Sequence, residues 1–247
     1  MTPRTLLALG AAVLAFSAGA LAFDGTAGLG ADVAVAAETS HDAAPVHVTK
    51  AELRRVDSIE LDAEALVLRN GNDTVVESSM RDSGLTVSVL NRLLGTPSRT
   101  QTAEGDGGAC FPAGTTYTWG GAIRVAALTT DAAAGNAVEI RVLRDSVRSV
   151  LGRQIELIGP GGVRVGDDIA DEIADAPRSE RVSYGSDDSR AWQLLLREGW
   201  ADRHEEDDDE SSEHSGDAGT NGVSALTNET TVTVLGSPMP VHAQRSC

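Results

Sequence analysis

Apolar and polar positions follow one another in short runs along most of the chain after about residue 56. Strict alternation is typical of a strand with one buried face, and it is clear at Val138, Ile140 and Val142. Asn70-Gly71-Asn72 predicts a tight hairpin. With turn residues as boundaries, we expect further strands over 58–68, 74–78, 115–119, 122–128, 155–158, 181–185, 191–197, 223–225 and 230–235.

Two stretches have helical spacing instead. Leu85, Val89 and Leu93 would form one apolar stripe, which Gly95-Thr96-Pro97 would end. A shorter helix is expected near Ile169 to Ala174, with Asp168 and Asp171 as a weak capping box. Strands, a helix, strands, a second helix and strands again indicate an α+β fold with antiparallel sheets rather than a βαβ series.

The domain organisation follows from this order. We expect one α+β domain over 50–247, built from two loosely repeated helix-plus-strands units at about 56–145 and 155–247. A flexible tether over 23–49 would precede it, because its alanine- and glycine-rich sequence has few large apolar residues to bury.

The first residues have the features of an export signal. Arg4 precedes an uncharged run from Leu6 to Phe23, and Ala20-Leu21-Ala22 has the small-residue pattern of a cleavage site. We therefore expect a signal peptide over 1–22 and a secreted or extracytoplasmic cell-surface protein. Two alternatives remain open: an uncleaved anchor over 6–23, which would be the chain's contact with the membrane, and a buried core helix.

The charge of the chain limits the kinds of partner that it can bind. The formal net charge is −17, and such a chain is repelled by nucleic acid and by anionic lipids. We expect no nucleic-acid binding. The usual explanation of such an acidic surface is that it keeps the protein soluble, and the alternative is that it binds a basic partner. Much of the charge lies in a polar insertion over 201–221, which contains six consecutive acids from Glu205 to Glu210. We expect an exposed disordered loop there, with loose metal binding through its carboxylates, His204 and His214 as the alternative.

Cys110 and Cys247 are the two cysteines of the chain. In an exported protein an even pair predicts a disulfide, here between the C-terminal residue and a distant loop. Intermolecular pairing and a free or metal-binding thiol are the alternatives.

Candidate chemistry is sparse. We expect no catalytic, cofactor-binding or metal-binding residues, since no motif of those classes stands out. Four acids at the start of the second helix are better explained as helix-terminus residues than as catalysts: Asp167, Asp168, Asp171 and Glu172. Trp119 and Trp200 are candidate partner contacts, with core packing as the more common alternative.

Three short motifs carry a family resemblance: Leu94-Gly95-Thr96-Pro97, Tyr117-Thr118-Trp119-Gly120 and Gly162 to Ile169. In these the chain resembles the envelope domains typified by the lipoprotein BamE (SmpA-like domains) and by the tandem β-lactamase-inhibitor protein, as do many exported proteins of GC-rich Gram-positive bacteria of the actinobacterial type. The resemblance implies short helices on a three-stranded antiparallel sheet and a non-catalytic binding role. It does not extend to the cysteines, because the chain lacks both the bridges within each repeat and the lipid-anchoring cysteine.

The sequence thus predicts an exported or cell-surface, non-catalytic binding or structural module whose partner is a protein or another envelope component. Two other classes stay open. One is a secreted hydrolase with a site that no motif marks, and the other is a metal-dependent binder that uses the acidic insertion.

Overall fold

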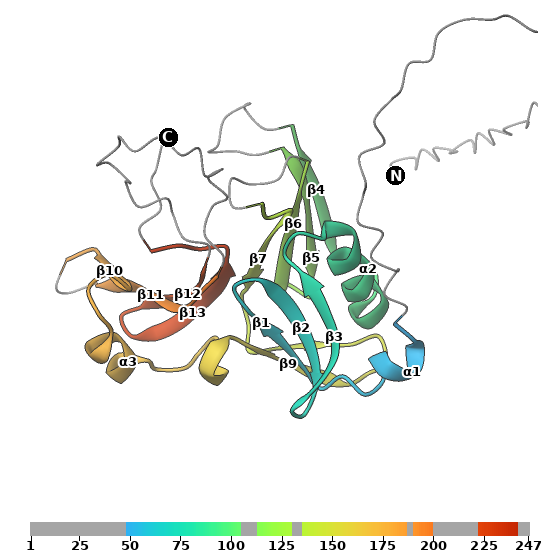
Figure 1. Cartoon of the computed structure of the whole chain (residues 1–247), viewed down its shortest axis with the longest axis horizontal. Coiled ribbons are helices and arrows are strands. Elements are labelled where there is room, and N and C mark those ends of the chain that lie inside the picture. The colour runs from blue at the N-terminus through green and yellow to red at the C-terminus, as the bar shows by residue number, and fades with distance from the viewer. Residues whose placement is uncertain (1–47, 105–112, 130–134, 187–189, 200–221, 242–247) are drawn as a thin grey trace, which may run out of the picture. The chain divides into compact units, whose positions relative to one another are not determined.

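A computed structural model describes residues 48–104, 113–129, 135–186, 190–199 and 222–241 (Figure 1). The chain divides into two compact units, Met1–Ala44 and Pro45–Cys247. All described residues belong to the second unit, and the account below concerns that unit alone.

One sheet has five strands in the order β3-β2-β1-β9-β8. Its neighbouring strands are antiparallel except for β1 and β9, which pair in parallel, so the expectation of purely antiparallel pairing is wrong at this place. The strands are β1 (Ser58–Leu61), β2 (Ala65–Asn70), β3 (Asp73–Ser79), β8 (Ser146–Arg148) and β9 (Gln154–Ile158).

The single strand expected over 58–68 is in fact two strands, β1 and β2. Asp62 turns the chain between them: its backbone N–H donates to the carbonyl oxygen of Ala65 at 2.9 Å, and its Oδ1 accepts from the backbone N–H of Ala63 at 2.7 Å. The apolar Ala63 lies in this turn and is buried. The spacing of apolar residues alone therefore did not reveal the turn. The hairpin at Asn70-Gly71-Asn72 is confirmed, with Asn70 opposite Asp73 and Gly71 at φ 58°.

The second sheet has eight strands in the order β10-β11-β12-β13-β7-β6-β5-β4, all paired antiparallel. The expected strands are present here with boundaries shifted by a few residues. They are β5 (Gly114–Trp119), β6 (Ile123–Leu128), β7 (Val138–Val142), β10 (Arg181–Tyr184), β11 (Ala191–Glu198), β12 (Gly222–Asn228) and β13 (Thr231–Ser237).

Two strands were not predicted. β4 (Arg99–Ala103) lies in a stretch that we expected to be a polar loop, and β8 is only three residues long. All five residues of β4 are exposed, so no apolar alternation marks the strand in the sequence. It is a strand because it pairs with β5, from Arg99 opposite Thr118 to Ala103 opposite Gly114.

The helices are short: α1 (Lys50–Leu53), α2 (Ser83–Leu94), α3 (Ala170–Asp175) and the 3-10 turn η1 (Pro160–Gly162). At α2, Asp82 Oδ1 accepts from the backbone N–H of Leu85 at 2.8 Å, and Gly95 ends the helix at φ 89°. The capping box predicted for α3 is wrong. Ile169 occupies the N-cap without a side-chain bond, and Asp168 Oδ1 accepts from the N–H of Ala170 at 3.1 Å.

One hydrophobic core joins these elements. It contains residues of α1, α2, α3 and both sheets, and Ile59, Leu68, Leu90, Trp119 and Ile140 are among its largest fully buried side chains. A backbone hydrogen bond also connects the two sheets. Ala137, just before β7, donates its N–H to the carbonyl oxygen of Met80, just after β3, at 2.8 Å. Few short helices on largely antiparallel sheets agree with the α+β class.

The N-terminal end of the described unit is held in place. Val48 is buried, its carbonyl oxygen accepts a hydrogen bond from the guanidinium of Arg92, and Thr49 caps α1. These are the last two residues of the stretch expected to be a tether. Among the residues that the structure describes, no helix combines the length and apolarity needed to cross a bilayer.

Candidate functional site

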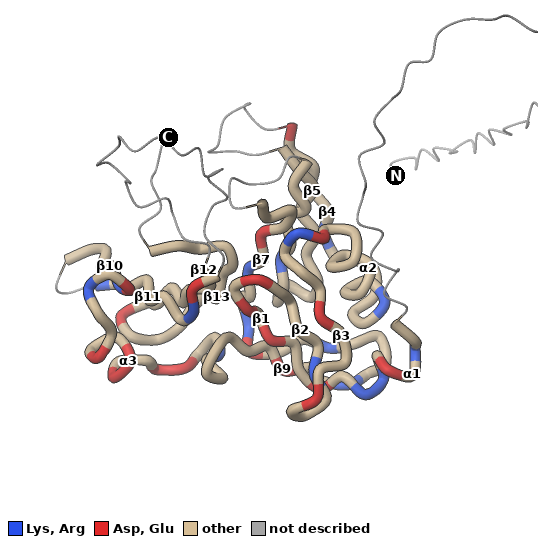
Figure 2. The backbone as a smooth tube through the Cα atoms, in the orientation of Figure 1, with Lys and Arg blue, Asp and Glu red and all other residues tan. Residues whose placement is uncertain are grey.

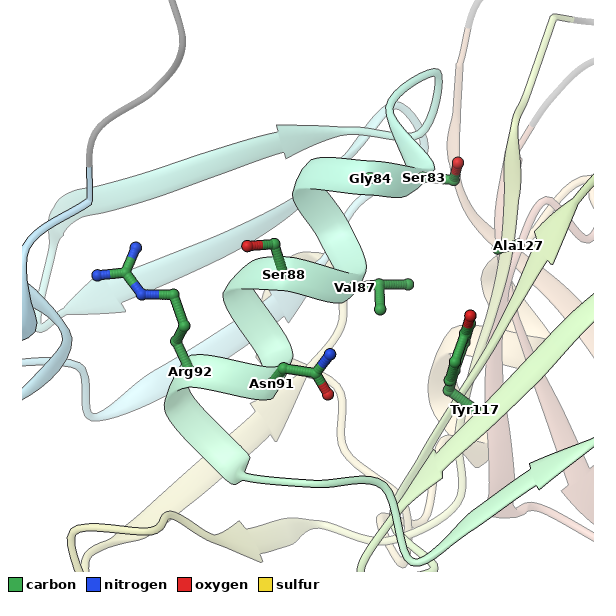
Figure 3. A pocket seen from close by; sticks show the side chains of 8 residues that line it. All are labelled: Ser83, Gly84, Val87, Ser88, Asn91, Arg92, Tyr117 and Ala127. Carbon is green, nitrogen blue, oxygen red and sulfur yellow. The ribbon is translucent and has the colours of Figure 1, made fainter. Parts of the chain in front are cut away.

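An open cleft of about 460 Å³ lies between α2 and the eight-stranded sheet (Figure 3). The helix forms one wall, and β5 and β6 form the other. The lining residues are Ser83, Gly84, Val87, Ser88, Asn91, Arg92, Tyr117 and Ala127.

The helix wall exists because α2 is amphipathic. Val89, Leu90 and Leu93 are buried in the core. The residues on the opposite side of the helix, among them Ser88 and Asn91, are exposed. Val87 and Asn91 are one helical turn apart and therefore lie on the same ridge. Figure 3 shows both side chains directed toward Tyr117, while Ser88 and Arg92 point to the other side of the helix.

The sheet wall is built around Tyr117. Side chains of a strand alternate between faces, so Tyr117 shares a face with Trp119, and their ring centroids are 6.0 Å apart. Trp119 is 1% exposed, whereas Tyr117 is half-buried and reaches the cleft. The Trp119 ring is therefore fixed in the core, and the Tyr117 ring packs beside it. This leaves the edge and the hydroxyl of the Tyr117 ring accessible in the cleft.

The cleft presents three groups that can recognise a ligand. Val87 supplies an apolar surface, Asn91 an amide with donor and acceptor atoms, and Tyr117 a ring with a hydroxyl. Within the described ranges no hydrogen bond engages the Asn91 amide or the Tyr117 hydroxyl. Arg92 is less available because its guanidinium bonds to Val48.

Two smaller hollows differ in character. One, of about 330 Å³, is lined by charged residues of β2, β3 and β11 and is crossed by an ion pair of 2.5 Å between Arg197 Nη1 and Asp62 Oδ2. The other, of about 370 Å³, lies at β8 among Arg144, Asp145 and Arg148. Neither contains an aromatic side chain, so the α2 cleft is the better candidate for recognition.

The opposite face of the sheet is polar. The register places Arg99, Thr118, Arg124, Arg141 and Gly236 in one row across five strands. Arg141 extends over Gly236, and its Nη1 donates to the carbonyl oxygen of Pro238 at 3.3 Å. Desolvation lowers the pKa of the half-buried Arg141, with Arg124 adding to this and Glu139 opposing it. This row therefore contains a structural arginine as well as exposed ones.

The structure decides one of the two tryptophan predictions. Trp119 is in the core and its indole N–H is bonded, so the core-packing alternative holds and the partner-contact prediction for Trp119 is wrong. Trp200, Cys110, Cys247 and the acidic insertion over 201–221 lie outside the described residues. The partner contact at Trp200, the disulfide between Cys110 and Cys247, and metal binding by the acidic insertion therefore stay predictions.

The four acids near α3 lie within six residues of the chain, and Figure 2 shows acidic segments of the tube at this helix. Asp167 Oδ2 accepts from the backbone N–H of Arg164 at 2.8 Å, and Asp168 accepts from Ala170. Asp171 and Glu172 stand exposed in the first turn of α3. Asp168 thus binds the first amide of α3, and Asp171 and Glu172 lie in the first turn, as expected of helix-terminus residues. Asp167 instead binds a turn that precedes the helix. In the part of the chain that the structure describes, no group of three or more His, Cys, Asp and Glu side chains is placed to hold a metal ion.

The cleft residues Val87, Asn91 and Tyr117 were not predicted as a site. The helical period places Val87 and Asn91 on one ridge, and the strand period places Tyr117 beside Trp119. No local signal shows that this ridge and this strand face each other, because that depends on how α2 packs across the sheet.

No known protein-family model, curated protein or solved structure matches the chain.

Proposed function

We propose that the chain is an exported, non-catalytic binding module that holds a segment of a partner protein in the cleft between α2 and the eight-stranded sheet. One observation carries this proposal: Val87, Asn91 and Tyr117 converge from two rigid elements on one open cleft, with their polar atoms unengaged among the described residues. Sites of this composition, an aromatic and an apolar group with a few polar atoms, are typical of recognition surfaces.

The chemistry of the cleft favours a polypeptide ligand. The Asn91 amide can donate to and accept from the same peptide group, while Val87 and the Tyr117 ring pack against an apolar side chain. An open cleft along a helix accepts an extended segment without burying the ligand fully. The backbone of the cleft is already formed, so binding costs little ordering of the protein itself.

Export is the second part of the proposal. Residues 1–22 act as a cleaved signal, with an uncleaved anchor over 6–23 as the alternative, and the mature protein is secreted or held at the cell surface. In that compartment Cys110 and Cys247 form a disulfide. Chain length supports the bridge: the residues from Cys110 to Ala113 and from Val241 to Cys247 extend to roughly 10 and 20 Å. Ala113 precedes β5, and the backbone N–H of Met239, just before the second segment, donates to Gly222 of β12. β12 and β5 are four strands apart in the sheet, about 19 Å.

The two-unit organisation is also a proposal. In its support, α2 is followed by the antiparallel strands β4 to β7, and α3 by the antiparallel strands β10 to β13. The last strands of the two series, β7 and β13, pair with each other. A helix followed by an antiparallel series of strands agrees in kind with the BamE-like and β-lactamase-inhibitor-like domains. That resemblance implies three strands, whereas each series here has four.

Site-specific photo-cross-linking tests the cleft. The full chain is expressed with a photo-reactive amino acid at Asn91, and separately at Ser183 on the exposed strand β10 as a control. We expect one protein adduct from Asn91 and none from Ser183. Once that partner is purified, Tyr117→Ala should weaken its binding by about 2 kcal/mol. Equal adducts from both positions, or binding that Tyr117→Ala leaves unchanged, would exclude the cleft.

Export has a separate test. Intact-mass analysis of the protein from the culture medium should give a chain that begins at Phe23. A full-length polypeptide confined to the cytosol would contradict this part of the proposal while leaving the cleft test valid.

A further inference from the structure

The edge strand β4 is open to an additional strand. It is the last strand of the eight-stranded sheet, all five of its residues are exposed, and within the described ranges β5 is the single strand that pairs with it. An edge strand presents unpaired backbone N–H and C=O groups along its outer side. β4 is therefore a place where a further strand gains backbone hydrogen bonds.

The other edges of the two sheets are less suited to pairing. β8 has three residues and β10 has four. At the β3 edge, the pairing with β2 is interrupted by an irregularity between Leu68 and Arg69. β4 pairs with β5 in unbroken register and contains neither proline nor an acidic residue. Bulges, prolines and charged side chains are among the usual protections against edge pairing. β4 has no bulge and no proline, and Arg99 at its start is its one charged residue.

We infer that β4 pairs antiparallel with β4 of a second copy of this chain, about a two-fold axis at Gln101. In that register Arg99 lies opposite Ala103 and Thr100 lies opposite Thr102 of the second copy. Threonine pairs across antiparallel strands are favourable. The two Arg99 side chains would be about 14 Å apart along the strands, so the charges do not oppose each other.

The faces of the two sheets also match. Thr102 Oγ1 lies 3.3 Å from Thr115 Oγ1, so Thr100 and Thr102 are on the same face as Thr115 and Tyr117. Because directly paired residues point to the same face, the joined sheets carry both α2 helices on one side. The pairing does not depend on the function proposed for the α2 cleft. A five-residue pairing is short, so the dimer is weak and its population depends on concentration.

A charge-swap experiment tests the two-fold register. The molar mass of the mature protein is measured by sedimentation equilibrium over a range of concentrations, for the parent chain and for Gln101→Lys and Gln101→Glu. Like charges directly opposite each other are unfavourable. Each variant alone should therefore dissociate about fivefold more readily than the parent, and an equimolar mixture of the two should restore the dimer by opposite charges.

The controls separate this dimer from other causes of association. Ser183→Lys places the same charge on β10, the opposite edge of the same sheet, and should leave the dimer unchanged. Thermal midpoints confirm that each variant is folded, and non-reducing electrophoresis detects dimers that are linked through cysteine. A parent chain that stays monomeric at every concentration, a dimer that only reductant dissolves, or a mixture that restores nothing would overturn the inference.

Discussion

The indole Nε1 of Trp119 donates a hydrogen bond of 2.9 Å to the carbonyl oxygen of Gly95. Gly95 is the residue at which α2 ends, and Trp119 is the last residue of β5. The bond fixes the end of the helix to the sheet and so holds the two walls of the cleft together. The indole is 1% exposed, so water does not replace this bond when it is lost.

Replacing Trp119 with Phe should remove the hydrogen bond and leave a small void in the place of the second ring. We expect the free energy of unfolding to fall by about 1–3 kcal/mol, because the Gly95 carbonyl loses its buried partner. Urea denaturation followed by circular dichroism measures the change. Tyr117→Phe is the matched control, since the structure gives the Tyr117 hydroxyl no partner among the described residues; a similar loss in both variants would contradict the role of the bond.

A buried hydroxyl pair supports the other side of α2. Ser78 Oγ and Thr86 Oγ1 are 2.7 Å apart and fully buried, and Thr86 Oγ1 donates to the carbonyl oxygen of Asp82 at 2.9 Å. Since a hydroxyl has one proton, Ser78 must be the donor within the pair. Thr86→Val then leaves the Ser78 hydroxyl unpaired and should destabilise by about 1–3 kcal/mol.

A double-mutant cycle checks this assignment. Ser78→Ala leaves the Thr86 bond to Asp82 intact and should cost less than Thr86→Val. The double variant should cost less than the sum of the two, because no buried donor is left unpaired. Strict additivity in urea denaturation would rule out coupling between the two hydroxyls.

Gly236 is the position that makes room for Arg141. A Cβ there would meet the Arg141 guanidinium and would lie 2.9 Å from Met239 Sδ. Gly236→Ala should displace Arg141 from its bond with Pro238 and lower the free energy of unfolding by about 1–3 kcal/mol.

Gly84→Ala is a matched control in the helix. The nearest atom to its Cβ would be Asp82 Oδ1 at 3.5 Å, and alanine is the better helix former. This variant should stabilise the protein by up to about 1 kcal/mol. Thermal melts of the two variants should therefore shift in opposite directions, and a stabilising Gly236→Ala would refute the packing argument.

The capping box at α1 makes stability depend on pH. Hydrogen bonds from the Thr49 backbone N–H and hydroxyl to Glu52 Oε2, at 2.6 and 2.8 Å, lower the pKa of the Glu52 carboxyl. A carboxyl whose folded pKa is depressed stabilises the fold above its unfolded pKa, and this contribution is lost as the pH falls through the folded value.

Thr49→Ala removes the hydroxyl donor but keeps the backbone N–H, which lowers the pKa of Glu52 more. The variant should therefore raise the pKa of Glu52 part of the way toward its ordinary value, which a carboxyl NMR titration measures directly. The variant should lose more stability at neutral pH than under strongly acidic conditions, where the bond from the Glu52 backbone N–H to the Thr49 hydroxyl is the part that is still lost. A Glu52 titration that is the same in both proteins would show that the Thr49 hydroxyl does not contribute to the lowered pKa of Glu52.

The sequence predicted a local feature correctly where that feature depends on a particular residue type at a particular position. Val89 and Leu93 of the expected stripe are buried in α2, and Leu85 is half-buried. Asn70-Gly71-Asn72 became a hairpin because Gly71 accepts a positive φ at no steric cost. Prediction failed at β4, whose residues face solvent on both sides and therefore show no alternation. It also failed at Trp119, since an aromatic residue in a strand looks the same whether it is buried or exposed.

The amino-acid sequence by itself determined the acidic balance of the chain, which is a sum over all its residues. It also determined the strands with a buried face, the turns and the amphipathic helix, because each of these depends on residues within a few positions of one another. The tertiary structure decided the rest. It paired β1 in parallel with β9, nearly a hundred residues later, and it joined β7 to β13. It also brought Val87 and Asn91 to face Tyr117. Such contacts depend on which surfaces bury the most apolar area together, and that property belongs to the whole chain rather than to any segment.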